Sequence, residues 1–355
     1  MTAMTVKDRS ATADDISAFL KRRARWSPFE IAFWVFAFAT IWLFPDKYLI
    51  LKDSAILALF ALSLDLILGY AGIISLGQAA FFGVAGYFSG LVAKYGIINE
   101  PVVALVCSGL VAAVLGFVTS FLVLRGTDLT RLMVTLGVSL MLGELANRYS
   151  DITGGADGLQ GVEIAPVLGR FDFDLYGHNA YVYCLIVLFV CFLIARRIVY
   201  SPFGLSLRAV KGNVLRASAI GIPVKWRLVS IYTIAAGFAG IAGALLTQTT
   251  AFCSLDVFSL ERSADLLLVL IIGGTGYLYG GLIGAVIYKL LQDWIANLTP
   301  QYWQFWIGLV LVVIVLIGRD RMAVWIAAAR AFVAGLVARV LPNAAALTGA
   351  APDER

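Results

Sequence analysis

Charged side chains are scarce in this chain of 355 residues. Asp, Glu, Lys and Arg make up 14% of the sequence, whereas a soluble globular domain carries about 25%. Hydrophobic residues make up 61%, and the mean hydropathy is +0.90. This balance excludes an ordinary soluble domain. Runs of Leu, Val, Ile and Ala with scattered Gly favour helices, since a membrane barrel would show alternating segments of about ten residues. We therefore expect an all-α polytopic membrane protein.

Catalytic and metal-binding patterns are lacking as well. The sequence has one histidine, His178, and contains no GxxxxGK[ST], HExxH or GxSxG motif. Its cysteines do not have the spacing of metal ligands and are typical of small buried hydrophobes. They are Cys107, Cys184, Cys191 and Cys253. The sequence thus predicts no catalytic residue, no metal site and no cofactor bound by this chain.

The formal net charge of +5 has a simple explanation in a membrane protein. Lys and Arg accumulate in the cytoplasmic loops, where they set the orientation of the spans. We therefore expect contact with membrane lipid and no nucleic-acid partner.

The apolar segments predict ten transmembrane helices, two of them short or broken by glycine, with both termini in the cytoplasm. A span needs about 20 apolar residues, and fewer where the helix is broken or buried in the bundle. The predicted spans are Ile31–Phe44, Ser54–Leu68, Ala79–Ala93, Val102–Leu124, Leu132–Asn147, Tyr181–Ala195, Leu228–Leu246, Ala264–Ile272, Gly280–Ile295 and Trp303–Ile317.

The charge of the connecting segments agrees with this orientation. Basic residues precede the first span, Arg125 and Arg131 flank the loop after the fourth, and Arg319 follows the tenth. The loop after the fifth span is acidic, as expected outside the cytoplasm. The predicted organisation is a cytoplasmic segment at 1–30, a transmembrane domain at 31–318 and a cytoplasmic tail at 319–355.

The tail is Ala- and Val-rich but not clearly a further span. Crossing the membrane with Met322–Leu341 would place Arg330 near the middle of the bilayer, which is costly. An amphipathic helix along the inner surface is favoured, followed by a disordered stretch from Asn343 to Arg355.

The loop from Arg196 to Arg227 is strongly basic. It carries seven Lys and Arg residues and no carboxylate, which places it on the cytoplasmic side. It is also long enough to form a small structure of its own, which a cytoplasmic partner could bind.

Two segments rich in glycine interrupt apolar stretches, Gly69–Gln78 in the first half and Ile272–Gly281 in the second. Glycine at this density breaks a helix and frees backbone polar groups, and paired broken helices indicate a translocation path. The alternative is that the glycines only permit close helix packing, as the spacing of Gly237, Gly240 and Gly243 indicates elsewhere. The candidate path residues are Gly72, Ser75, Gly77, Gln78, Gly273, Gly274 and Gly276.

Ionisable residues at membrane depth are few. Asp65 lies near the inner end of the second span and has no obvious partner in the sequence, so it either lines a cavity or reaches the cytoplasmic interface. Glu144 and Arg148 are one turn apart, a spacing that predicts an ion pair. Asp265 begins the eighth span.

Several motifs in order resemble the membrane permease subunits of branched-chain amino-acid ABC importers, in particular the longer of the two paired permeases. The resemblance covers residues 50–320. It rests on Gly69–Gly72 with Ser75–Gly83, Arg125–Gly126 with Thr135–Gly137, Thr153–Gly158, Ser201–Gly204, Arg208–Ala209, Ala239–Leu245, Gly273–Gly276 and Gly280–Ala285.

The resemblance implies a second related permease, two cytoplasmic ATPase subunits that carry ATP and Mg²⁺, a periplasmic solute-binding protein and a bacterial inner membrane. It also implies a coupling helix that transmits the motion of the ATPases. Here that helix would be Leu207–Ile220, ended by Gly221 and Pro223. Relatives often carry acidic residues where this chain has Gly212 and Val214. The candidate coupling residues are Arg208, Lys211, Asn213, Arg216 and Gly221.

The solute stays open at this point. Branched-chain amino acids are the default expectation, and the wider family also moves urea, amides and small organic or aromatic acids. The alternative from another class is an ion-coupled secondary transporter that uses Asp65 or Glu144. An intramembrane enzyme would lack its catalytic residues.

Overall fold

The structure is a computed structural model that describes residues 28–126, 128–167, 169, 171 and 177–317. Most of the predicted N-terminal segment and the predicted tail, including Met322–Leu341, lie outside the described residues. The chain divides into two compact units, one that ends at Asp293 and one that begins at Trp294. The first unit contains both broken segments and the basic loop.

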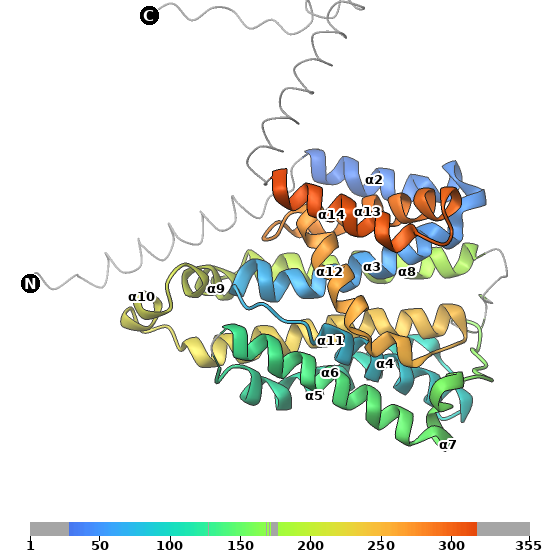
Figure 1. Cartoon of the computed structure of the whole chain (residues 1–355), viewed down its shortest axis with the longest axis horizontal. Helices are drawn as coiled ribbons and strands as arrows, with labels where there is room; N and C mark the ends of the chain where they lie inside the picture. Colours follow the sequence, from blue (N-terminus) through green and yellow to red (C-terminus); the bar gives the residue numbers. More distant parts are fainter. Residues whose placement is uncertain (1–27, 127, 168, 170, 172–176, 318–355) are drawn as a thin grey trace, which may run out of the picture. The chain divides into compact units, whose positions relative to one another are not determined.

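Within the described residues the chain is helical, with only isolated β-bridges (Figure 1). The α-helices are α2 (Pro28–Leu43), α3 (Tyr48–Asp65), α4 (Gln78–Lys94), α5 (Pro101–Val123), α6 (Asp128–Arg148), α7 (Ser150–Thr153), α8 (His178–Val199), α9 (Pro202–Gly212), α10 (Val214–Ala219), α11 (Val224–Thr250), α12 (Leu260–Gly273), α13 (Leu278–Leu298) and α14 (Trp303–Ile317). Short turns of other helix types are η1 (Pro45–Lys47), η2 (Leu66–Ala71), η3 (Gly155–Asp157) and η4 (Leu255–Phe258).

Each of the ten predicted spans coincides with a helix, which confirms the all-α membrane fold. Five helical segments are long and apolar enough to cross a bilayer, and a sixth is obtained if α12 and α13 form one broken span. Helices α2, α4 and α14 have only 16, 17 and 15 residues. The number of crossings and the cytoplasmic placement of the termini therefore stay predictions.

Helix α11 lies at the centre of the first unit and packs against α3, α4 and α5. The close approach depends on glycine: a Cβ on Gly240 would overlap Ala112 of α5, and a Cβ on Gly243 would overlap the backbone of Phe82 in α4. The predicted close packing is thus confirmed at Gly240 and Gly243, whereas a Cβ on Gly237 would make only ordinary contacts at 3.4 Å or more. Helix α6 is peripheral. Only 11% of its most apolar 18-residue stretch is buried, whereas 89% is buried in the corresponding stretch of the segment that contains α3.

Both glycine-rich segments break the helices, as predicted. Helix α3 continues into the π-helical turn η2, which ends at Gly72 in a left-handed conformation (φ +74°) before α4 begins at Gln78. In the second half, α12 and α13 meet at an angle of 111° across the break that contains Gly274 and Gly276. Positive φ at these glycines explains the residue type, because side chains strain such a backbone.

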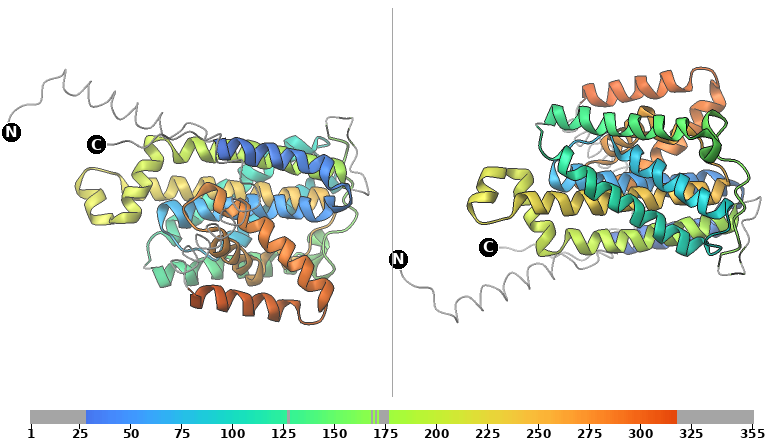
Figure 2. Two further views of the ribbon diagram at one scale, coloured as in Figure 1. Left: turned by 90° about the horizontal axis from the view of Figure 1, so that it is seen from above. Right: turned by 90° about the horizontal axis from the view of Figure 1, so that it is seen from below.

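The basic loop folds into two helices rather than the single predicted helix Leu207–Ile220. Asn213 adopts an extended backbone (φ −163°, ψ 112°) between α9 and α10, and its side chain caps α10. Asn is among the best N-cap residues, so it starts a second helix where a longer one was expected. The predicted end is correct: Gly221 has φ +85° just before Pro223. Figures 1 and 2 show α9 and α10 projecting beyond the ends of the long helices.

Candidate functional site

The two broken segments meet at Asp65, the last residue of α3. Its side chain is fully buried, and Oδ1 accepts a hydrogen bond of 2.7 Å from the backbone N–H of Gly276. One turn later, Gly69 leaves the space for this contact: a Cβ there would overlap Asp65 Oδ1 and lie 2.6 Å from Gly276 N. A buried carboxylate is costly unless it is hydrogen-bonded, so Asp65 fixes the break of one half against the π-helical turn of the other.

The basic hairpin joins the same point through Lys211. Its ammonium group donates a hydrogen bond of 2.6 Å to the carbonyl oxygen of Gly69. Gly69 lies in the last turn of η2, where carbonyl groups no longer find partners within the helix. A hydrogen bond from a charged donor contributes about 1.5–3 kcal/mol. Asp65, Gly69, Lys211 and Gly276 together are called the crossing below.

The other predicted coupling residues take different positions. Arg208 lies over the ring of the buried Tyr70, with its guanidinium carbon 5.2 Å from the ring centre. The Asn213 side chain accepts a hydrogen bond of 2.9 Å from Arg216 N, so its role here is to begin α10. Arg216 and Gly221 are exposed. The predicted set therefore divides into residues that face the bundle and residues that remain accessible.

The rest of the first broken segment is held by α6 and α12. Leu76 N donates to Thr135 Oγ1 at 3.2 Å, and Ala79 N donates to Ser263 Oγ at 3.4 Å. A Cβ on Gly77 would lie 2.7 Å from the carbonyl oxygen of Thr135. At Gly77 this geometry favours the packing alternative.

Gln78 differs from its neighbours, because its side chain is fully buried and finds no hydrogen-bond partner among the described residues for either amide atom. Leaving a buried polar group unpaired costs about 1–3 kcal/mol. Ser75 is equally buried, but its hydroxyl accepts a hydrogen bond of 3.3 Å from Gly77 N. Gln78 is thus the predicted path residue with free hydrogen-bonding capacity in this part of the structure.

In the second broken segment the glycines serve two purposes. A Cβ on Gly273 would overlap the carbonyl oxygen of Gly280, so Gly273 allows α12 to approach α13. Gly274 and Gly276 instead have φ of +95° and +82°. The sequence alone could not separate packing from backbone conformation at these positions.

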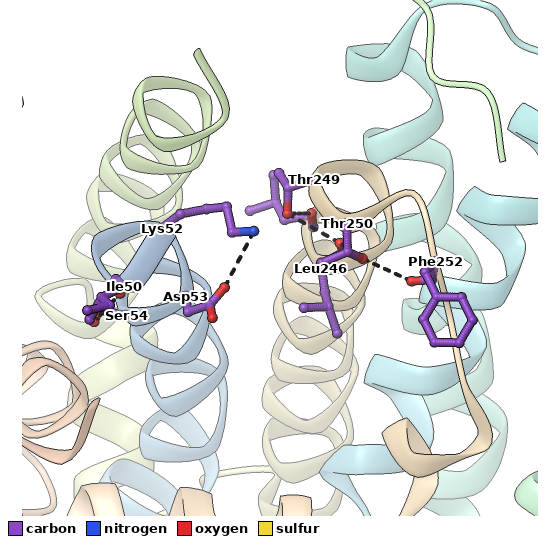
Figure 3. A network of polar contacts seen from close by, with 9 residues as sticks. Ile50, Lys52, Asp53, Ser54, Leu246, Thr249, Thr250 and Phe252 are labelled. Carbon is purple, nitrogen blue, oxygen red and sulfur yellow. Dashed lines mark hydrogen bonds and ion pairs between the residues drawn. The ribbon is translucent and has the colours of Figure 1, made fainter. Parts of the chain in front are cut away.

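None of the ion pairs among the described residues was predicted, and two of them involve buried side chains. Arg196, counted above with the basic loop, forms an ion pair with Glu30 of α2 in which both side chains are largely buried. At the other end of α3, buried Lys52 lies 3.6 Å from Asp53, and Figure 3 shows it extending toward Thr249 and Thr250 of α11. Neighbours in sequence do not normally face each other on a helix, which is why this pair is not evident from the pattern.

The predicted ion pair of Glu144 and Arg148 is absent from the ion pairs of the described residues, and both side chains are exposed. Exposed pairs at this spacing contribute only about 0.3–0.5 kcal/mol, too little to hold two long side chains together.

Near the same end of the bundle, burial raises the pKa of the Cys253 thiol to about 12, so this thiol stays protonated at neutral pH.

The sequence left Asp65 between two settings, a cavity and the cytoplasmic interface, because no partner was evident. A signal was present: Asp65 is the one carboxylate between Ser54 and Leu68, and it stands one turn before Gly69. Its partner Gly276 could not be deduced, since the two residues are 211 positions apart.

Comparisons with known proteins agree with this arrangement. A protein-family profile described as "Branched-chain amino acid transport system / permease component" matches residues 48–318. No solved structure matches the chain.

Three relatives illustrate the similarity. The chain is 23% identical to the high-affinity branched-chain amino acid transport system permease protein LivM of Escherichia coli, over 68% of this chain and 61% of that protein. For LivM of Salmonella typhimurium the identity is 25% with the same coverage. For the probable branched-chain amino acid transport permease protein LivH of Methanocaldococcus jannaschii it is 26%, over 68% of this chain and 77% of that protein.

The match thus spans about three fifths of the length of the LivM relatives. The family profile, in contrast, covers most of this chain and includes both broken segments, the basic hairpin and every residue of the crossing. The chain belongs to the family of branched-chain amino acid transport system permease components.

Proposed function

We propose that this chain is the transmembrane permease subunit of an ATP-binding-cassette importer. It forms half of a translocation pathway, pairs with a second related permease, and acts with two cytoplasmic ATPase subunits and a periplasmic solute-binding protein. It is not itself an enzyme, and ATP and Mg²⁺ are bound by the partner subunits. The names of its relatives favour branched-chain amino acids as the solute.

The proposed setting is the inner membrane of a bacterium. The ten helices from α2 to α14 that coincide with the predicted spans would cross or enter the membrane, and both termini would lie in the cytoplasm. The clustering of Arg125, Arg131, Lys211 and Lys225 at the hairpin end of the molecule supports this orientation.

The observation that carries the proposal is the bond from Lys211 to Gly69 at the crossing. In the proposed mechanism the ATPases bind the exposed surface of α10 and the turn at Gly221, and their closure displaces the hairpin. Helix α9 is bonded to η2, and α3, which continues into η2, is bonded to the break at Gly276. The displacement would therefore reach both broken segments together. Packed elements that have two arrangements convert small shifts into a change of state, and we propose that the hairpin and the broken segments act in this way.

The proposed path runs along the broken segments, where the unpaired amide of Gln78 offers both a donor and an acceptor to a passing polar solute. Gly72, Ser75 and Gly274 lie on the same two segments. A polar lining at the break would replace the hydrogen bonds to water that a polar solute loses at membrane depth.

The test is reconstitution of the complete importer in vesicles, with the partner subunits expressed from the neighbouring reading frames. Uptake of labelled leucine is expected only with ATP and the binding protein. A variant with residues 207–220 scrambled should insert into the membrane and lose uptake. Solute flux through the chain alone without ATP, or full uptake by the scrambled variant, would contradict the proposal.

A further inference from the structure

A cavity of about 600 Å³ lies beside the crossing, on the side of the first unit where the hairpin begins. Its walls come from the end of α5, the start of α6, the end of η2, the α9–α10 hairpin and the start of α11. The opening is thus framed by segments that the orientation proposed above places at the inner surface of the membrane.

The charge in this cavity is unbalanced. Four cationic side chains line it, Arg125, Arg131, Lys211 and Lys225, together with one carboxylate, Asp128. Asp128 already forms an ion pair of 2.9 Å with Arg131. Lys211 bonds to an uncharged carbonyl group. The cavity therefore retains an excess of positive charge that an anion would neutralise.

Apart from Ser120, the other side chains that line the cavity are apolar. Phe121, Leu124, Val210 and Leu228 line the cavity, and the Lys225 ammonium lies 5.9 Å from the centre of the Phe121 ring. A small hydrated anion would gain nothing from such walls. An amphiphile with a negative head and hydrocarbon close to that head would fit both surfaces.

An apolar stripe runs from this cavity along α5. Leu110, Val114, Val118 and Leu122 follow one another at a spacing of four residues, so they lie on one face of the helix. Their side chains are 58–63% exposed. Val118 of this stripe stands three residues before Phe121 of the cavity wall, a spacing that makes the two side chains neighbours on the helix, so the stripe borders the cavity at Phe121.

We propose that this cavity binds the phosphate-bearing headgroup of an anionic phospholipid from the inner leaflet, with an acyl chain along the exposed stripe of α5. Arg125 and Lys225 bind the phosphate. Arg131, although paired with Asp128, adds to the positive potential of the cavity. The headgroup then lies against the start of α11 and the hairpin, where it stabilises one position of α9. The inference uses the proposed orientation but not the identity of the transported solute.

The experiment is native mass spectrometry of the assembled importer, equilibrated with equal amounts of phosphatidylglycerol and phosphatidylcholine of the same chain length. We expect wild-type importer to retain phosphatidylglycerol in preference. The double variant Arg125→Gln, Lys225→Gln should lose roughly tenfold or more of this preference, because each basic side chain near a lipid surface contributes about 1 kcal/mol. The control double variant Lys94→Gln, Arg148→Gln removes two exposed charges outside the cavity and should retain it.

Several outcomes would overturn the proposal. They are equal retention of both lipids by the wild type, unchanged preference in the Arg125 and Lys225 variant, or an equal loss in the control variant. Displacement of the lipid by excess inorganic phosphate would show a soluble anion as the ligand and also overturn it. The preference of the wild type for phosphatidylglycerol is measured without any substitution, and Arg125→Lys, which keeps the charge, should retain it. The test therefore remains decisive even if the double variant fails to fold.

Discussion

Helices α9 and α10 are neighbours in one basic hairpin, yet their surroundings are opposite. Helix α9 buries Leu207 and Val210 and bonds to η2 through Lys211. Helix α10 buries only Ala217 and leaves Leu215 81% exposed, and Ile220 just after it is 74% exposed. The extended residue Asn213 separates them. Helix α9 therefore attaches the hairpin to the bundle, and α10 offers an exposed surface that a partner could bind.

The largest effect is expected from filling the space between the two broken segments at Gly69. In Gly69→Ala the new Cβ would overlap Asp65 Oδ1 and press on Gly276 N, so the hydrogen bond between the broken segments cannot form. We expect a loss of about 3 kcal/mol or more in stability, since the clash is combined with the loss of a hydrogen bond to a buried carboxylate. Thermal unfolding of the purified importer measures it.

The matched control is Gly137→Ala in α6, where a Cβ meets nothing within 4 Å. It removes a helix-interior glycine and should leave stability unchanged or raise it by up to about 1 kcal/mol. Equal loss in both variants would mean that the crossing is not a special point in the fold.

The next largest effect distinguishes the role of α9 from that of α10. Lys211→Met keeps the aliphatic stem and removes the donor to Gly69, so we expect uptake to fall roughly tenfold while the ATPases still co-purify. Arg216→Met removes an exposed charge on α10 and should instead weaken ATPase retention. Lys211→Arg should recover part of the uptake.

Comparison of uptake with ATPase retention in the same preparations decides this prediction. If Lys211→Met releases the ATPases and Arg216→Met does not, the roles of α9 and α10 are reversed and the account is wrong.

A third prediction tests whether Gln78 of the first broken segment lies on the solute path. Gln78→Leu replaces a buried unpaired amide with an apolar side chain of similar volume, and should raise stability by about 1–2 kcal/mol. If the amide serves the solute, uptake falls in the same variant. A variant that is more stable and transports normally would remove Gln78 from the path.

The smallest effect concerns the boundary between the two helices. Asn213→Ala removes the cap of α10 and should cost about 1 kcal/mol, confined to that helix. Hydrogen exchange should become faster at 214–219 and stay unchanged in α9. Faster exchange in both helices would show that they unfold as one unit.

The sequence predicted the helices well because hydropathy and length determine where a chain can enter a membrane. It also located the breaks, since glycine-rich segments cannot continue a helix. The contacts that give these elements a role were not predictable, because Lys211 and Gly69 are 142 residues apart and periodicity carries no information about such pairs. The break at Asn213 had a local signal, a good N-cap residue, that the single-helix prediction overlooked.

The coupling through α9 is tested most directly by double electron–electron resonance, which measures distances between pairs of spin labels on the assembled importer. Spin labels at the exposed positions Leu215 and Tyr277 report the hairpin and the second break, and a label at Val114 of α5 provides the reference. Between the nucleotide-free and ATP-bound states, the 215–277 distance should change by less than about 2 Å while the 215–114 distance changes by several Å. If the 215–277 distance changes as much as the reference distance, the hairpin does not move with the crossing and the account is contradicted.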